Sequence, residues 1–302
     1  MTLTFRRVIK QRKELIASFF WCIGFLWLII EITDYFFNYK DKISSRYFCV
    51  IILIWFVYAL KANRPKSYFE YKLRDKDVYI WVRIGNLIDT KWAIVVPINN
   101  KFNINQNGVT NAKSILNTII TEIYNGNKEH LDWDIKNKID IAITHDIWTT
   151  IEIVNKNRKL YFVANSHLNK NQRSESTIND FYDTLNQFFY HISTDSDREE
   201  ELAVPLFNSW HGRIPNLTRD TIVKEMIYLF IEAVKTKVVC DKLVIYIYPD
   251  DIKKWQIDID EIEKYLAYNA NNYRDIVVNN ATPEWHIVEW SQIPSEIQSI
   301  KN

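Results

Sequence analysis

Three segments rich in asparagine and glycine each follow an apolar run, and their residue types suit the binding of an anion. They are Gly85-Asn86-Leu87-Ile88, then Pro97 to Phe102 with Asn99, Asn100 and the later Asn107-Gly108, and finally Val204 to Arg213 with Asn208, Ser209, His211, Gly212 and Arg213. A glycine loop that empties into a helix N-terminus presents unpaired N–H groups and the positive end of the helix dipole. Each segment alone is more typical of a plain turn, but two such loops together suit a diphosphate.

Acid-base and nucleophilic chemistry is the alternative use of this sequence. His145-Asp146 and Ser166-His167 are candidate pairs, but adjacent residues on a strand point to opposite faces and do not readily share a site. We expect surface or packing roles for both pairs. His211 differs because it lies in a predicted ligand loop beside Trp210, whose ring suits stacking on a base.

Six apolar or aromatic runs are predicted as strands and four stretches with helical period as helices. The strands are Val78–Ile84, Trp92–Ile98, Ile147–Val154, Lys159–Ala164, Leu202–Leu206 and Leu243–Tyr248, and the helices are Asn111–Tyr124, Thr177–His191, Thr218–Val234 and Ile259–Tyr268. A late strand is also considered at Trp285–Trp290. The alternation predicts a three-layer α/β domain with a mixed, mostly parallel sheet. Ligands bind such sheets at the carboxyl ends of the strands, where the three segments lie.

The N-terminal part of the chain reads as a transmembrane hairpin. The uncharged run Leu15–Ile30 extends to Phe37, about 23 residues and roughly 34 Å of helix, and a second apolar run covers residues 43–60. The first run is long, aromatic and followed by another, so we expect retained anchors rather than a cleaved signal peptide. Basic residues flank the outer end of each run, which predicts that both termini face the cytoplasm.

The expected organisation is therefore a basic N-terminus at residues 1–14, transmembrane helices at about 15–37 and 43–60, a juxtamembrane linker at 61–76 and a ligand-binding domain at 77–302. The net charge of +1 gives no general attraction to nucleic acid, and we expect none as a partner. The three cysteines, Cys22, Cys49 and Cys240, have no metal or disulfide spacing and are expected to be packing residues.

The order of these segments resembles the macro domain family. Gly85-Asn86-Leu87-Ile88 stands where macro domains usually have Gly-Asp-Ile, and Ala93 to Asn100 stands where they have an apolar run that ends in asparagine. The run Ala203–Leu206 with its Gly212 loop is similar to the second phosphate-binding segment, and Leu243–Asp250 to the strand that ends near the adenosine. The resemblance covers roughly residues 77–250 and implies binding of ADP-ribose or a related nucleotide.

Two N-terminal membrane helices before a divergent macro domain resemble the effector of type II Thoeris anti-phage systems. The resemblance implies a histidine-linked ADP-ribose signal made by a TIR-domain enzyme, binding by the macro domain, and membrane damage that kills the cell. It also implies the bacterial inner membrane as the location. A ligand acts on the membrane part only by favouring one of two states, so we expect a homo-oligomer.

Two departures from the macro pattern shape the expected chemistry. Asn86 replaces the aspartate that accepts from the adenine amino group, and the Asn107-Gly108 loop lacks the glycine run of macro-domain hydrolases. We therefore predict binding without turnover, no catalytic residues, no metal and no cofactor. The alternatives are a membrane-tethered hydrolase of NAD or an ADP-ribose derivative, and a membrane sensor or scaffold with no toxic output.

Overall fold

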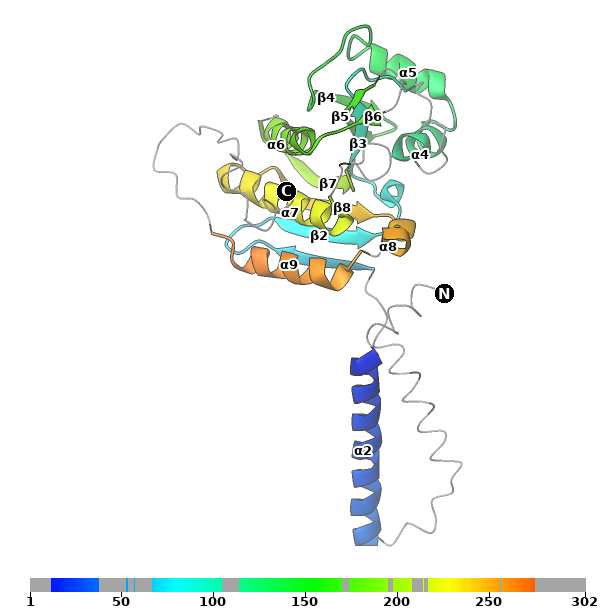
Figure 1. Ribbon diagram of the computed structural model, residues 1–302, viewed down its shortest axis with the longest axis vertical. Helices are drawn as coiled ribbons and strands as arrows, with labels where there is room; N and C mark the ends of the chain where they lie inside the picture. Colours follow the sequence, from blue (N-terminus) through cyan, green and yellow to red (C-terminus); the bar gives the residue numbers. More distant parts are fainter. Residues whose placement is uncertain are drawn as a thin grey trace. The chain divides into compact units, whose positions relative to one another are not determined.

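The computed structural model describes residues 12–37, 53, 57, 67–104, 114–169, 174–194, 198–207, 214, 217–255 and 257–274 (Figure 1). The chain divides into two compact units, Met1–Ser67 and Tyr68–Asn302. Of the predicted site residues, Asn107, Gly108, Asn208, Ser209, His211, Gly212 and Arg213 lie outside the described residues, as does the late strand considered at Trp285–Trp290.

The first unit contains the helix α2 (Arg12–Phe37), which covers the first predicted apolar run. Its large apolar side chains include Trp21, Phe25 and Leu28, and all three are exposed. Of the second run, the structure describes only Leu53 and Val57, both helical. Within the described part of the chain, no helix meets the length and hydropathy needed to cross a membrane.

The second unit is built around one mixed sheet in the order β1-β2-β8-β7-β3-β5-β4, with β6 paired to β5. The strands are β1 (Tyr68–Lys72), β2 (Tyr79–Ile84), β3 (Ala93–Asn99), β4 (Thr150–Asn155), β5 (Arg158–Leu168), β6 (Ser174–Glu175), β7 (Glu199–Pro205) and β8 (Cys240–Ile247). Strands β2, β8, β7, β3 and β5 run parallel, while β1 and β4 pair antiparallel with the two ends of this set. The predicted mixed, mostly parallel sheet is confirmed.

The two middle strands, β3 and β7, are joined over very little of their length. They share only the pairs Ala93↔Leu202 and Ile94↔Ala203, whereas β3 pairs with β5 from Ile94 to Asn99. Pro97, which has no N–H to donate, lies in the part of β3 beyond the ladder to β7. At this point the sheet is therefore held together by the start of β3 and the middle of β7.

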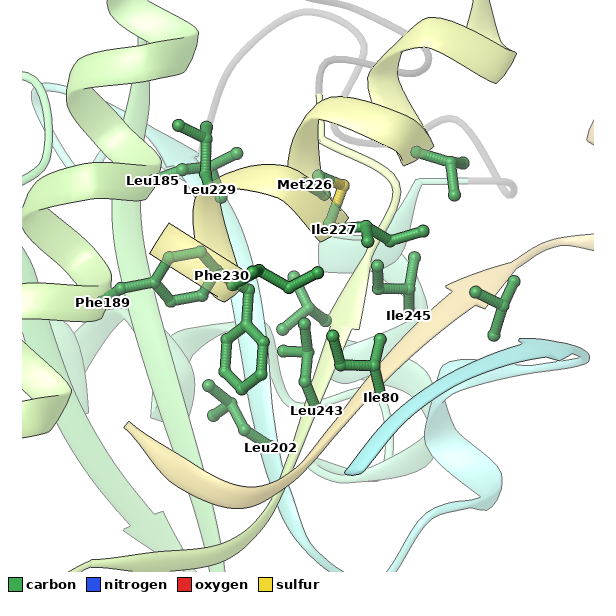
Figure 2. Packing of buried hydrophobic residues seen from close by; sticks show 14 of the residues in the cluster. Ile80, Leu185, Phe189, Leu202, Met226, Ile227, Leu229, Phe230, Leu243 and Ile245 are labelled. Atoms are coloured by element: carbon green, nitrogen blue, oxygen red, sulfur yellow. The ribbon is translucent and has the colours of Figure 1, made fainter. Parts of the chain in front are cut away.

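Two apolar cores cover the two faces of the sheet. Figure 2 shows part of the first, where Phe189 of α6 (Ile178–Thr194) meets Phe230 of α7 (Arg219–Thr236) with ring centroids 5.5 Å apart. This core also takes in Leu202, Leu243 and Ile245 from the strands and the buried face of α9 (Ile259–Asn271).

The second core lies on the opposite face of the sheet. It joins Ile94, Val96 and Phe162 of the central strands to α4 (Ile115–Glu122) and α5 (Lys128–Lys136). Adjacent residues of β3 alternate between the two cores, as period two requires. The three-layer α/β arrangement predicted from the sequence is confirmed.

The structure adds elements that hydrophobic period did not indicate. These are β1, α5, the short helix η2 (Leu87–Asp89), β6 and α8 (Pro249–Trp255). Strand β1 lies inside the segment expected to be a linker, where Phe69 is buried between exposed Tyr68 and Glu70. The globular unit accordingly begins at Tyr68 rather than at residue 77.

A buried carboxyl group lies where α6 and α7 pack together. The Tyr182 hydroxyl donates to Glu225 Oε2 at 3.0 Å, and Glu225 is buried. Burial raises the pKa of Glu225, and burial together with the nearby Glu225 raises the pKa of Tyr265 to about 12. Cys240, at the start of β8, is also fully buried and its thiol pKa is raised mainly by desolvation, in agreement with the expected packing role.

The raised pKa of Glu225 predicts a pH-dependent contribution to stability. Since the folded state binds this proton more tightly than the unfolded chain, the stabilisation is full below the ordinary glutamate pKa of about 4.3 and is lost as pH rises through the folded pKa. Glu225→Gln keeps an acceptor for Tyr182 and removes the titration. In urea unfolding of the full chain, we expect the variant to become progressively more stable than the wild type as pH rises. Glu129→Gln, at an exposed position of α5, is the control, and parallel pH curves for the wild type and Glu225→Gln would contradict the assignment.

Candidate functional site

The carboxyl ends of the five parallel strands meet at one edge of the sheet, and the described members of the predicted site lie there. Gly85 follows β2, while Asn99 ends β3 and Asn100 follows it. The chain passes outward from β3 to the β5 side and outward from β7 to the β8 side, so the connections diverge between β3 and β7. This is the switch point at which open α/β sheets bind ligands.

Gly85 extends the pairing of β2 with β8 by one backbone hydrogen bond. Its N–H donates to the carbonyl oxygen of Ile247 at 3.1 Å. A Cβ atom placed on Gly85 would meet nothing within 4 Å, so the α-carbon faces open space. The exposed Arg83 is two residues away, and its Nη1 donates to the Tyr246 hydroxyl oxygen at 3.4 Å. Open space at Gly85 and the cation of Arg83 thus lie near the same strand end.

Asn86 and Leu87 have local structural roles. Asn86 caps η2 in an extended conformation, and its side-chain oxygen accepts from the Ile88 N–H at 3.4 Å. Leu87 is buried in the second core. The Asn86 side chain, which stands where macro domains usually have an aspartate, is therefore engaged in shaping the connection between β2 and β3.

The side chain of Asn99 holds the turn after β3 together through hydrogen bonds, and Asn99 is only 2% exposed. Its Oδ1 accepts from the N–H groups of Lys101 at 3.0 Å and Asn103 at 3.3 Å, and its Nδ2 donates to the Asn103 carbonyl at 2.8 Å. Phe102 adopts a positive φ of 51° inside this turn and is fully buried. Both polar atoms of the Asn99 carboxamide are thus hydrogen-bonded to the backbone of this turn.

Asn100 is also buried, at 4% exposure, but its side chain is left partly unsatisfied. Its N–H donates to the Ser166 carbonyl at 2.8 Å, and its carbonyl accepts from the His145 N–H at 2.9 Å. Its Nδ2 lies 3.1 Å from His167 Nδ1, while its Oδ1 has no hydrogen-bond partner in the described structure. A buried acceptor without a donor costs free energy unless a ligand satisfies it.

Ser166 and His167 are adjacent on β5 but differ in exposure. Ser166 is buried, whereas the His167 side chain is 53% exposed and its Nε2 lies 3.1 Å from Asp180 Oδ1. His145, in the other candidate pair, directs its ring Nε2 to the Asp140 carbonyl at 2.7 Å. Within the described part of the chain, each of these two histidine rings bonds to a residue outside its own pair, His145 to Asp140 and His167 to Asp180.

The contribution of His167 and Asp180 was missed from the sequence. Asp180 is in the first turn of α6, where its N–H donates to Thr177 Oγ1 at 3.2 Å and its Oδ2 accepts from the Thr177 N–H at 2.7 Å. This reciprocal pair is a capping box, and the spacing Thr177-Ile178-Asn179-Asp180 is its signature. That signal fixes the start of α6 but does not reveal that a histidine of β5 shares the same carboxylate.

Metal binding has no candidate ligand set among the described residues, where no group of three or more His, Cys, Asp or Glu side chains is suitably placed. The polar side chains near the strand ends instead include the carboxamides of Asn99 and Asn100, the imidazole of His167 and the guanidinium of Arg83. Such a set is suited to hydrogen bonding with hydroxyl, amide and phosphate groups of an organic ligand.

Comparison with solved structures finds macro domains. The Oceanobacillus iheyensis macrodomain with MES bound is 11% identical, with a TM-score of 0.44 over 67% of this chain and 99% of that one. The same macrodomain with ADP is 11% identical, with a TM-score of 0.38 over 68% and 100%. A mutant of tomato leucine aminopeptidase is 11% identical, with a TM-score of 0.41 over 66% of this chain and 37% of that one.

The family of this chain is assigned from its sequence. A comparison with curated proteins found no match. The model of the family described as Thoeris protein ThsA, Macro domain, matches residues 80–248, from β2 to the end of β8. This match spans more than half of the chain and includes every parallel strand, and the chain therefore belongs to the Thoeris ThsA macro domain family.

Proposed function

We propose that the unit Tyr68–Asn302 is a receptor for an ADP-ribose-derived nucleotide, which it binds at the carboxyl edge of its sheet. The observation that carries this proposal is the early end of the β3–β7 ladder at the switch point, with open space at Gly85 and an unsatisfied carboxamide oxygen at Asn100. A nucleotide would bring a hydroxyl donor for the unsatisfied Asn100 oxygen.

The loops that contain Asn107 and Gly108, and Asn208 to Arg213, complete the proposed site on the grounds of their sequence. Backbone N–H groups of these loops would hold the diphosphate, and His211 would lie near a base. Gly85 would let the ligand approach closely at the end of β2. Asn99 contributes by shaping the turn that presents Asn100, because its own polar atoms bond to the backbone.

Binding rather than turnover is supported by the hydrogen bonds of His167, a histidine of β5 beside Asn100. A histidine held by a carboxylate can serve as a general base through its other nitrogen. Here that nitrogen, Nδ1 of His167, lies 3.1 Å from Asn100 Nδ2, and in the neutral ring with its proton on Nε2 it accepts a hydrogen bond from the amide. The lone pair needed to activate water is thus engaged, which favours a receptor over the alternative of a membrane-tethered hydrolase.

The family assignment supports a wider proposal about signalling. The ligand is a histidine-linked ADP-ribose type of signal released by a TIR-domain enzyme, with no cofactor required. Its capture favours an oligomer of this chain, and the N-terminal apolar segments then disrupt the bacterial inner membrane from the cytoplasmic side. Such coupling requires that the ligand bind the assembled state more tightly than the single chain.

Ligand binding is tested by titration calorimetry of the full chain in mild detergent with ADP-ribose and its histidine conjugate. We expect heat of binding and unchanged ligand afterwards, as judged by chromatography. Asn100→Ala should weaken binding about tenfold, the loss of roughly one hydrogen bond. Asn272→Ala, at the end of α9, should bind like the wild type. Product formation would favour the hydrolase, and no heat with either ligand would refute the receptor.

Gly85 offers a second test, because added volume there meets open space. Gly85→Val should leave thermal stability within about 1 kcal/mol of the wild type, yet reduce nucleotide affinity by blocking close approach to the strand end. Gly126→Ala provides the opposite control, since Gly126 has φ of 81° and an alanine is strained there. It should cost about 1 kcal/mol of stability without changing affinity. Full affinity in Gly85→Val would place the ligand elsewhere.

Membrane attachment is tested by fractionation of cells that express the full chain. The exposed Trp21, Phe25 and Leu28 of α2 and the apolar sequence of residues 43–60 support partition into the bilayer. We expect the full chain to sediment with membranes and to resist alkaline carbonate, whereas a chain beginning at Tyr68 should be released. Recovery of the full chain in the soluble fraction would contradict this part of the proposal.

A further inference from the structure

We infer that His167 and Asp180 are positioning residues that set the orientation of the Asn100 carboxamide, so that its oxygen accepts a hydrogen bond from the ligand. The three side chains form a continuous chain, Asp180 to His167 at 3.1 Å and His167 to Asn100 at 3.1 Å. The inference rests on the proposed nucleotide binding. It assigns which partner donates and which accepts in one hydrogen bond of that site, with Asn100 as the acceptor.

The hydrogen-bonded chain Asp180–His167–Asn100, here called the relay, begins at a carboxylate whose position is fixed. Asp180 is buried in the first turn of α6, and its Oδ2 accepts the Thr177 N–H at 2.7 Å. The other oxygen, Oδ1, is left to meet the imidazole of His167. Because one oxygen is locked to the backbone of the helix start, the position of the second is set by the fold rather than by side-chain choice.

The carboxylate then determines which nitrogen of His167 carries the proton. An ionised carboxylate only accepts hydrogen bonds, so Nε2 of the neutral ring must be the N–H that faces Asp180. Nδ1 is consequently a lone pair, and it faces Asn100. The only group of a carboxamide that can bond to a lone pair is the NH₂, which agrees with Nδ2 lying 3.1 Å from Nδ1.

The orientation of Asn100 follows from these two steps. Its backbone is already fixed on both sides, by the Ser166 carbonyl and the His145 N–H, and His167 removes the remaining choice between the two amide orientations. The oxygen must then point away from His167, and it is the atom left buried without a partner in the described structure. The site therefore presents an acceptor here, which selects a ligand hydroxyl or N–H and disfavours a phosphate oxygen.

Protonation of His167 reverses this arrangement. With both ring nitrogens as donors, Nδ1–H would oppose the Asn100 NH₂, and the amide must turn to offer its oxygen to the ring. Of the ionisable groups nearby, Asp180 contacts His167 directly and Glu175 pairs with it on β6, while Asp183 acts on Asp180 and His145 contacts the backbone of Asn100. Acid should therefore weaken ligand binding by withdrawing the acceptor.

Two substitutions of His167 separate positioning from packing. His167→Asn places a carboxamide oxygen at about the position of Nδ1, so it accepts from Asn100 and does not titrate. His167→Phe fills the same space and accepts nothing. The matched control is His130→Phe, since His130 is 52% exposed and lies 3.8 Å from Asp134 on α5, an element that does not reach this edge.

The experiment is calorimetric titration of each full-length variant with ADP-ribose between about pH 5.5 and pH 8, the range in which histidines titrate. At the upper pH we expect His167→Phe to bind about tenfold more weakly than the wild type and His167→Asn to stay within about threefold. The wild type and His130→Phe should lose affinity on acidification, while His167→Asn should not.

Thermal melting accompanies each titration. Should His167→Phe fail to fold, Asp180→Asn takes its place, and it too is expected to weaken binding because the ring tautomer is no longer fixed. Wild-type affinity and an unchanged pH profile in a folded His167→Phe would overturn the relay while leaving nucleotide binding intact. Absence of binding by the wild type at every pH would instead refute the proposed function, and the relay with it.

Discussion

The arrangement of the ligand edge depends on the short ladder between β3 and β7. Parallel strands that stay paired to their ends bring their final residues together and fill the edge with backbone hydrogen bonds. Here the pairing stops at Ile94 and Ala203, and Pro97 and Pro205 follow, neither of which donates an N–H. The strands still run in one layer because β5 holds β3 and β8 holds β7 from outside. An opening at the switch point thus coexists with a continuous core on each face.

Two neighbouring asparagines at the end of β3 differ in how far the fold itself satisfies their side chains. The register with β5 shifts between Ile98 and Asn99, so the chain leaves the regular strand geometry at this point. Asn99 turns inward and bonds three times to the backbone of its own turn, whereas Asn100 keeps one carboxamide atom unused. Both are equally buried in practice, so burial alone does not distinguish structural from functional asparagine.

Much of the architecture was predictable because its cause is local. Runs such as Ala93–Asn99 and Leu243–Ile247 are apolar on both faces, which requires a sheet covered on both sides, and the helical period of residues 219–236 matches α7. Strand β1 was not recognised because only Phe69 and Tyr71 face the core and the other residues are polar or exposed. The placement of Gly85 and Asn100 at one edge followed from topology. The link from Asn100 through His167 to Asp180 did not, because it joins three elements whose proximity no spacing in the sequence expresses.

The antiparallel pairing of β1 gives the unit an unusual point of entry. Tyr68, its first residue, pairs with Arg83, so the chain arriving from the N-terminal unit joins the sheet beside Gly85, at the edge where we propose that the nucleotide binds. A movement of the backbone at Tyr68 and a movement at Gly85 would both act on the same end of the β1–β2 ladder, at the Tyr68–Arg83 pair. A ligand bound at Gly85 would need to shift only β1 and β2 to displace the first residue of the unit, with no movement of the helices or of the far side of the sheet.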